Sequence, residues 1–356
     1  MSPPKLIDVA REAGVDVATA SRALHRGKGW ERLSAECVRR VTFHAEKLGY
    51  RPNAAARGLR QQRVGVVGLL LPVEQHSAFV SRLTVALQDA LRQRGLHALL
   101  IAGRRPIGEA EALYQERRID GLIAPVFSLR PIDLKALKAS SIPHVLTHQT
   151  PGARRKPQSP VVILDSAKGI EQAVDLFVSL GHRSLLWAGY DPERNPDVAH
   201  RRKAFVFACQ MHDLPCEEVV VPDVGSSGGV APAIEAAKRS MLAILRDPNR
   251  PSGVVCYHDM IALGVLSAAR EIGVAVPEQL SVIGFDDAWG EIADPPLTSI
   301  SHAPACIAEA AVNALLDIIG RGDPGEFTAA PVVIAPEIVC RQSTGPAPDS
   351  AGSAPH

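Results

Sequence analysis

Few features of membrane, secreted or metal-binding proteins are present in this chain of 356 residues. Its six cysteines are scattered, without a CxxC pair or a histidine at ligand spacing. The longest apolar run, residues 64–73, reaches roughly half of a bilayer span, and the first residues contain no hydrophobic signal core. We therefore expect a cytoplasmic protein with reduced thiols, no metal, no cofactor and no membrane partner.

Catalytic motifs are missing as well. The sequence contains no GxSxG, no HExxH, and no pair of a nucleophile and a base that can be placed together. The glycine-rich stretch at residues 225–229 (GSSGG) is neither a GxGxxG nor a Walker loop. We therefore expect that the protein is not an enzyme.

The charge is divided unevenly along the chain. Residues 1–63 contain 13 Lys and Arg against 6 Asp and Glu, whereas residues 64–356 contain 26 against 32. The net charge of +1 therefore hides a basic head on an acidic body. Such a division is expected when only the head approaches the phosphates of nucleic acid.

The basic head has the pattern of a helix-turn-helix. A first short helix is indicated by apolar residues at i, i+3, i+4 and i+7, namely Leu6, Val9, Ala10 and Ala13. Gly14 suits the tight turn that follows, and the carboxylate of Asp16 can cap a second helix. We expect that helix to bury Val17, Ala20 and Leu24 and to expose Ala18, Thr19, Ser21 and Arg22. A third helix is predicted after Ser34. These features are typical of a DNA-binding head over residues 1–50.

A short alanine-rich segment follows at residues 51–62. Asn53 to Arg60 spans barely two helical turns, which is too short for a stable isolated helix, and Gly58 weakens it further. This segment is therefore a linker or a helix that forms only against a partner.

The body alternates short apolar runs with amphipathic helical stretches. We expect strands at residues 65–71, 97–102, 121–126, 144–147, 161–164, 184–188, 253–257 and 280–285. Such alternation predicts parallel sheets covered by helices on both faces, and the number of units predicts two similar lobes. The fold class is thus an all-α helix-turn-helix head plus a two-lobed α/β body. The tail at residues 345–356 is rich in Pro, Ala, Ser and Gly and is expected to be disordered.

The head resembles the lactose/galactose (LacI/GalR) repressor family. The matching stretches are DVA at 8–10, AGV at 13–15, Thr19, SR at 21–22 and LGYRPN at 48–53. The resemblance implies that a group of head residues contacts DNA, namely Asp16, Val17, Ala18, Thr19, Ser21, Arg22, His25, Asn53, Ala56 and Leu59. Within it, residues 17, 18 and 22 would read base edges, while Thr19, Ser21 and Asn53 would grip phosphates. An anionic Asp16, where the family commonly has Ser, would repel a nearby phosphate.

The same resemblance bears on the linker. In the family this segment folds only on operator DNA, where two copies lie side by side in the minor groove. Ala56 and its neighbours would let the two helices approach closely, and Leu59 would insert between base pairs and kink the duplex.

The resemblance continues through the body, on DGLI at 120–123, GFDD at 284–287 and PPLT at 295–298. It implies a periplasmic-binding-protein-like effector and dimerisation domain over residues 63–344. The N-lobe would comprise residues 63–163 and 292–329, and the C-lobe residues 164–291 and 330–344. The chain would therefore cross between lobes near residues 163, 291 and 330.

Open α/β sheets bind ligands beyond the carboxyl ends of their strands. This rule selects His76, Phe79, His148, Asp165, Tyr190, His258, Asp286 and Trp289. The resemblance adds Arg201 and implies that Arg201 and Asp286 hydrogen-bond an effector, often a sugar. A guanidinium and a carboxylate can bracket vicinal hydroxyls.

Histidine stands at three of these positions, His76, His148 and His258, where the family commonly has Asn or Asp. Imidazoles can become cationic, so an anionic effector such as a sugar acid or sugar phosphate is one hypothesis. A neutral sugar is a second hypothesis, and a nucleobase or another metabolite is a third. The three histidines lie on separate segments without local ligand spacing, which argues against zinc.

The sequence therefore predicts a DNA-binding transcriptional regulator, a repressor as most family members are. It would bind a pseudo-palindromic operator in double-stranded DNA as a homodimer, controlled by a small effector between two lobes. The alternative from another class is a sugar- or nucleotide-dependent enzyme with an attached DNA-binding head. A solute-binding protein would share the body but not the head.

Overall fold

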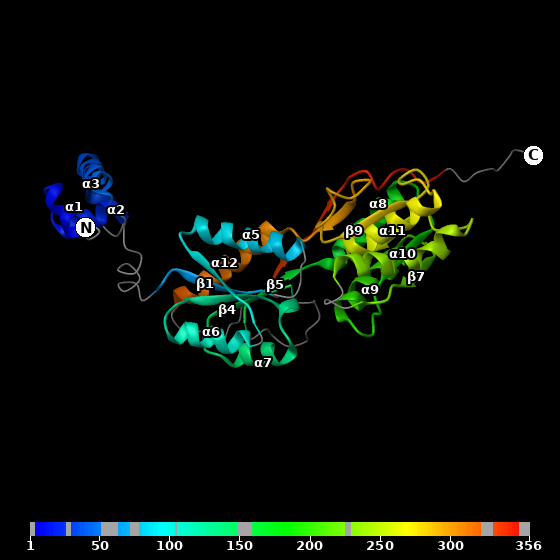
Figure 1. Cartoon of the computed structure of the whole chain (residues 1–356), viewed down its shortest axis with the longest axis horizontal. Coiled ribbons are helices and arrows are strands. Elements are labelled where there is room, and N and C mark those ends of the chain that lie inside the picture. Colours follow the sequence, from blue (N-terminus) through cyan, green and yellow to red (C-terminus); the bar gives the residue numbers. More distant parts are fainter. Residues whose placement is uncertain are drawn as a thin grey trace, which may run out of the picture. The chain divides into compact units, whose positions relative to one another are not determined.

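A computed structural model describes residues 4–25, 30–50, 63–71, 78–103, 105–148, 159–224, 229–321 and 330–348. The chain divides into two compact units, residues 1–65 and residues 66–356 (Figure 1). Four expected site residues, Asn53, Ala56, Leu59 and His76, lie outside the described residues, as does the linker at residues 51–62.

The first unit contains the expected three helices. These are α1 (Leu6–Glu12), α2 (Val17–His25) and α3 (Ala35–Leu48), with a 3-10 turn, η1 (Trp30–Arg32), before the third. Their shared core is made of small apolar side chains, including Val9, Ala20 and Val41. Val17, expected to face inward, is instead 40% exposed because it starts α2 at the edge of this core, and Ala23 is buried on the inner side.

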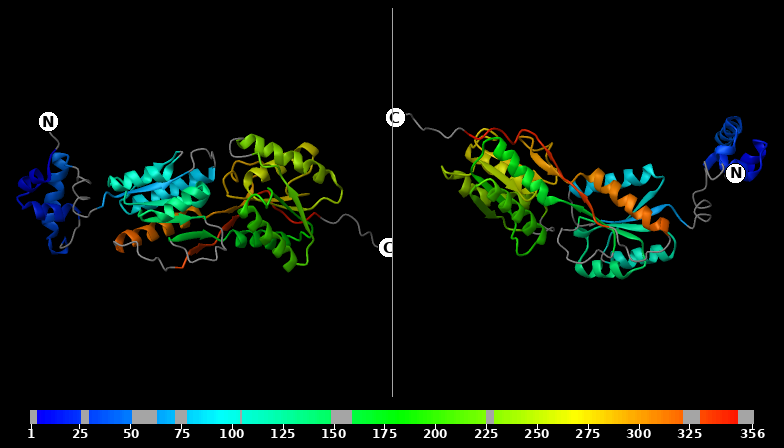
Figure 2. Two further views of the ribbon diagram at one scale, coloured as in Figure 1. Left: turned by 90° about the horizontal axis from the view of Figure 1, so that it is seen from below. Right: turned by 180° about the vertical axis from the view of Figure 1, so that it is seen from behind.

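The N-lobe of the second unit is built on an entirely parallel sheet in the order β11-β5-β4-β3-β1-β2. The strands are β1 (Val66–Leu70), β2 (His97–Ile101), β3 (Gly121–Pro125), β4 (His144–Thr147), β5 (Val161–Leu164) and β11 (Val332–Ile334). Helices α5 (Ala78–Gln93) and α12 (Pro304–Arg321) pack together on one face, and α6 (Pro106–Gln115) and α7 (Pro131–Ala139) cover the other (Figure 2). A second 3-10 turn, η2 (Val126–Ser128), follows β3. Buried strands between two helical layers explain the continuous apolar runs of the sequence.

The C-lobe has a second sheet in the order β12-β10-β9-β8-β6-β7. Its strands are β6 (Leu185–Gly189), β7 (Cys216–Val220), β8 (Gly253–Cys256), β9 (Ser281–Phe285), β10 (Thr298–Ser301) and β12 (Glu337–Val339). The pairs are parallel except that β12 runs antiparallel to β10. Helices α8 (Ser166–Ser179) and α9 (Pro196–Met211) pack together on one face, and α10 (Val230–Arg246) and α11 (Asp259–Ile272) on the other.

The chain changes sheets after β5, after β10 and between β11 and β12. The second and third changes fall near residues 302 and 335, later than the expected 291 and 330. The reason is strand pairing: β10 pairs with β9 in the C-lobe, and β11 pairs with β5 in the N-lobe. The start of the expected disordered tail is also attached to the C-lobe, because Gly345 accepts from His182 and Ala347 N–H donates to Leu180.

Within the described residues, no helix is long and apolar enough to cross a membrane. The same residues contain no group of three His, Cys, Asp or Glu side chains suited to a metal ion. The six cysteines are free thiols, two of them buried.

Candidate effector site and DNA-reading surface

The exposed start of α2 presents the residues expected to read DNA. Asp16, Val17 and Ala18 are exposed, and Thr19, Ser21 and Arg22 are partly buried along the helix. The side chain of His25 lies outside the described residues.

Asp16, Thr19 and Arg22 form a chain of hydrogen bonds on this surface. One carboxylate oxygen of Asp16 accepts the Thr19 N–H at 2.8 Å, and the other accepts the Thr19 hydroxyl at 2.7 Å. The Thr19 hydroxyl oxygen accepts in turn from Arg22 Nη2 at 3.0 Å. The hydroxyl hydrogen bond from Thr19 lowers the pKa of Asp16, so the carboxylate is charged. Thr19 therefore gives both of its donors to Asp16 rather than to an external phosphate.

Arg201 is the centre of the candidate effector site. It lies on α9 with 6% of its surface exposed. Its guanidinium contacts Asp197 one turn earlier at 3.0 Å and donates to the Tyr257 carbonyl at 2.8 Å. It also stacks 3.6 Å above the Phe285 ring and lies 4.0 Å from Asp286. Burial disfavours its charge, but Asp197, Tyr257 and Asp286 together raise the pKa of Arg201, which therefore stays cationic.

Asp286 follows β9 and carries the second charge. Its backbone is left-handed, with φ of 97°, and its Oδ1 accepts from Nε2 of His302 at 2.8 Å. Burial raises the pKa of Asp286 to about 6 and lowers the pKa of His302 to about 3. At neutral pH the pair is thus a carboxylate and a neutral imidazole that donates to it. The Nδ1 of this imidazole is then an acceptor.

His302 also joins the two lobes at this point. It lies where the chain passes from β10 to α12, and its ring centroid is 4.1 Å from that of Phe79 at the start of α5. His148, after β4, packs edge-on against Phe79 and against Phe127, with centroids 5.3 Å apart in each case. The site therefore has an aromatic wall from the N-lobe that connects through His302 to the Arg201 group from the C-lobe.

His148 and His258 are held as neutral imidazoles. Burial lowers the pKa of both, that of His148 well below its usual value. His148 Nδ1 bonds the Thr147 hydroxyl at 2.9 Å. His258 caps α11, where its Nδ1 accepts the Ile261 N–H at 3.2 Å, so its Nε2 carries the proton donated to the Tyr190 oxygen at 2.9 Å.

Two other expected effector residues have structural roles in the described contacts. Asp165 follows β5 and caps α8 by accepting the Lys168 N–H at 3.1 Å. Trp289 is partly buried, and its backbone N–H donates to the buried carboxylate of Asp259 at 3.0 Å. Neither contact involves Arg201.

The structure brings in residues that sequence reasoning missed, namely Phe127, Asp197, Tyr257 and His302. Asp197 could have been found because it precedes Arg201 by four residues, which places both on one helical face. His302 follows a strand directly, so the strand-end rule would have selected it if residues 298–301 had been recognised as a strand.

Three buried polar atoms of this site have no hydrogen-bond partner within the described part of the chain: Arg201 Nε, His148 Nε2 and His302 Nδ1. Buried polar atoms are almost always hydrogen-bonded in folded proteins. Three unsatisfied polar atoms in one cluster, among them the Arg201 donor and the His302 acceptor, therefore indicate a place for a polar ligand or water.

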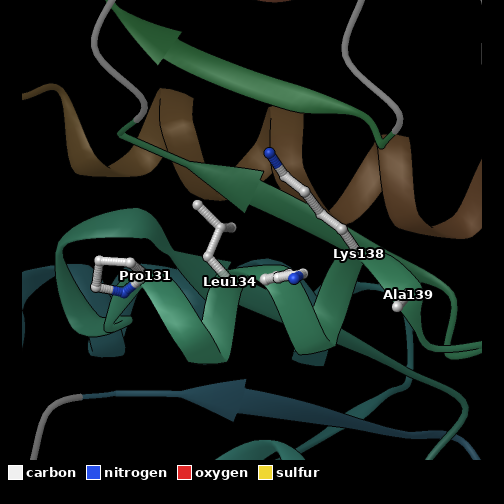
Figure 3. A pocket seen from close by; sticks show the side chains of 5 residues that line it. Pro131, Leu134, Lys138 and Ala139 are labelled. Carbon is white, nitrogen blue, oxygen red and sulfur yellow. The ribbon is translucent and has the colours of Figure 1, made fainter.

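A separate hollow of about 520 Å³ lies against α7 (Figure 3). It is lined by Pro131, Leu134, Lys135, Lys138 and Ala139. It shares no residue with the Arg201 site.

Comparison with known proteins agrees with this architecture. Residues 5–53 match the family model of bacterial regulatory proteins, lacI family, and residues 174–344 match the periplasmic binding protein-like domain. MalR of Streptomyces coelicolor, an HTH-type transcriptional regulator, is 32% identical over 98% of each chain. A helix-turn-helix head on a two-lobed binding body defines a DNA-binding transcriptional regulator, not an enzyme. The chain belongs to the lacI family of these regulators.

Two solved structures share the fold. The lac repressor dimer bound to operator and the anti-inducer ONPF superposes with a TM-score of 0.67, at 22% identity, over 97% of this chain and 100% of the other. The complex of the regulator CelR with cellobiose has a TM-score of 0.63, at 21% identity, over 96% and 99%. The family and the fold class predicted from the sequence are thus confirmed.

Proposed function

We propose that this regulator is a cytoplasmic repressor that binds a pseudo-palindromic operator as a homodimer and is controlled by a sugar at the Arg201 site. The observation that carries the proposal is the set of unpaired buried donor and acceptor atoms around Arg201, in a body attached to a DNA-binding head. The operator-bound lac repressor dimer supports the assembly, since it has the same fold.

The charges of the site favour a neutral sugar over an anionic one. Arg201 is already flanked by two carboxylates, Asp197 at 3.0 Å and Asp286 at 4.0 Å. The pKa of His148 and that of His302 are lowered by burial, so neither ring supplies a positive charge at neutral pH. The described site therefore carries no surplus positive charge to compensate a sugar acid or sugar phosphate. This argues against the anionic effector that His76, His148 and His258 suggested in the sequence.

The available atoms suit a polyhydroxylated ring. Asp286 and the His302 Nδ1 accept hydrogen bonds from hydroxyls, and Arg201 Nε donates one. The Phe79 and Phe127 rings provide apolar surface for the carbon face of a sugar. The CelR–cellobiose complex shows that a protein of this fold binds a neutral disaccharide.

Operator binding would respond to the sugar through the lobes. A ligand that bonds Arg201 and Asp286 from the C-lobe and touches Phe79 in the N-lobe stabilises one angle between them. A coupling of about 1–3 kcal/mol changes operator affinity about 5- to 150-fold.

Fluorescence anisotropy with labelled DNA from upstream of the chain's own gene tests this proposal. The complex is titrated with cellobiose, ribose, glucuronate and glucose 6-phosphate. We expect release by a neutral sugar, and a weakened response in His148→Asn and Arg201→Met, with the exposed Arg239→Gln as a matched control. Release by the two anions alone, or an unchanged response in Arg201→Met, would refute the proposed site.

A further inference from the structure

The loop after β9 presents two consecutive carboxylates to two different groups of partners. Asp286 and Asp287 both have left-handed backbones, with φ of 97° and 49°. Such conformations are unfavourable for a non-glycine residue and persist only when surrounding contacts impose them. Asp286 bonds His302 in the effector site, as described above, whereas Asp287 contacts two arginines outside that site.

Contacts from the C-lobe hold this loop in place. Asp259 accepts the N–H groups of Ala288 and Trp289 at 2.7 and 3.0 Å, and the Asp287 N–H donates to the Ser299 hydroxyl at 3.0 Å. Gly290 leaves space for the Arg341 guanidinium, since a Cβ at this position would lie 2.2 Å from Arg341 Nη1. The two carboxylates are therefore fixed relative to each other.

Asp287 is shared between a C-lobe and an N-lobe cation. Arg341 lies 2.7 Å from Oδ1 and is anchored by a hydrogen bond to the Leu297 carbonyl at 2.8 Å, so this contact stays within the C-lobe. Arg82 donates to Oδ2 at 3.1 Å from α5 in the N-lobe. The Asp287 side chain is 8% exposed and that of Arg82 is 39% exposed. The interlobe contact is therefore the one that solvent reaches and that can open.

Residues three apart on helix α5 connect it to both carboxylates, to Asp287 directly and to Asp286 through His302. Phe79 stacks on His302, which bonds Asp286, and Arg82 lies on the same side of the helix and bonds Asp287. Any movement of the loop that a ligand causes through Asp286 therefore acts on the Arg82 contact.

We propose that the ion pair between Arg82 and Asp287 is an interlobe latch that transmits the state of Asp286 to α5. This inference rests on the proposed function, because it assigns part of the response to the effector to a contact outside the effector site. With the latch in place, a change at Asp286 alters the angle between lobes. Without the latch, the same change at Asp286 does not alter the angle between the lobes.

A four-variant comparison in the free full-length protein tests the latch without any sugar. Spin labels are attached through non-natural amino acids at Lys135 on α7 and Arg239 on α10, and pulsed EPR measures their distance distribution. The variants are the parent chain, Asp286→Asn, Arg82→Ala, and both together. When Arg82 is present, we expect Asp286→Asn to change the relative populations of short and long distances between the labels about two- to five-fold, which is the size of effect that a partly exposed ion pair allows. When Arg82 is absent, we expect Asp286→Asn to leave the distribution unchanged.

Two controls accompany this comparison. Arg92→Ala removes another α5 arginine, whose partner Asp89 lies on the same helix, and should behave as the parent does. Arg82→Lys keeps the charge and should retain the response. If Asp286→Asn changes the distances equally with and without Arg82, the latch is disproved. If no sugar in the panel binds, the proposed effector is wrong, but the four-variant comparison still tests the latch because it uses no sugar.

Discussion

Asp16 opposes the DNA contacts that the family resemblance assigns to its neighbours. Its carboxylate takes both donors of Thr19, which the family resemblance assigns to a DNA phosphate, and it adds a negative charge to the reading surface. We predict that Asp16→Ser, which keeps a helix-capping hydroxyl, raises operator affinity about threefold or more and steepens its salt dependence. Anisotropy titrations at several salt concentrations measure this. Asp16→Ala, which loses the cap, is the control and should lower Tm. Equal or weaker binding by Asp16→Ser would contradict the prediction.

The pKa of Asp286 makes stability depend on pH at this residue. Its folded value of about 6 exceeds the unfolded value near 3.8, so between these pH values the folded state binds more protons. The contribution of Asp286 to the free energy of unfolding is therefore complete below about pH 4 and is lost as the pH rises to about 6. We predict that the free energy of unfolding of Asp286→Asn, measured relative to that of the parent, rises by about 1 kcal/mol from pH 5 to pH 7.5. Urea unfolding at both pH values measures the difference, and a gap that does not change with pH would disprove it.

At the scale of elements, a tightly packed glycine in β9 and an exposed glycine in α6 are predicted to respond in opposite ways to replacement by alanine. A Cβ at Gly284 would lie 2.3 Å from Asp259 Oδ1 and 2.9 Å from Leu297, so Gly284→Ala should cost about 1–3 kcal/mol. A Cβ at Gly108, in the exposed part of α6, meets nothing within 4 Å. Gly108→Ala should stabilise by up to about 1 kcal/mol. Thermal unfolding measures both. Similar stability changes would show that packing at β9 is looser than described.

The elements also show what sequence reasoning could find. Helices with an apolar stripe and strands with continuous apolar runs were predicted, but four strands, β7, β10, β11 and β12, were missed. The most consequential of them is β10. Its sequence, TSIS, is mostly polar, yet Thr298 and Ser299 are fully buried because Ser343 and Asp259 satisfy their polar atoms. Those partners come from segments about 40 residues away, which no local pattern reveals. Missing β10 displaced the second crossing and hid His302.

At the scale of the whole molecule, the head was predictable because its three helices contact near neighbours in sequence. The effector site was predictable only in part. Arg201 and Asp286 follow from the family resemblance, but their pairing with His302 and the aromatic wall depends on segments that meet only in the folded body. Charge is divided within the molecule: residues 1–63 are basic, whereas Arg201 in the candidate effector site is paired with Asp197 and Asp286.

This division predicts different responses to salt for the two binding reactions. Operator binding releases counterions from phosphates, so raising salt from 50 to 200 mM should weaken it about 10³-fold or more if six or more phosphates are contacted. Sugar binding should change less than about twofold, because Arg201 is already paired with Asp197 and Asp286 and a neutral ligand adds no charge. Anisotropy and calorimetry over the same salt series measure the two reactions in one preparation. A sugar affinity that falls steeply with salt would instead indicate an anionic ligand, with positive charge supplied from outside the described residues.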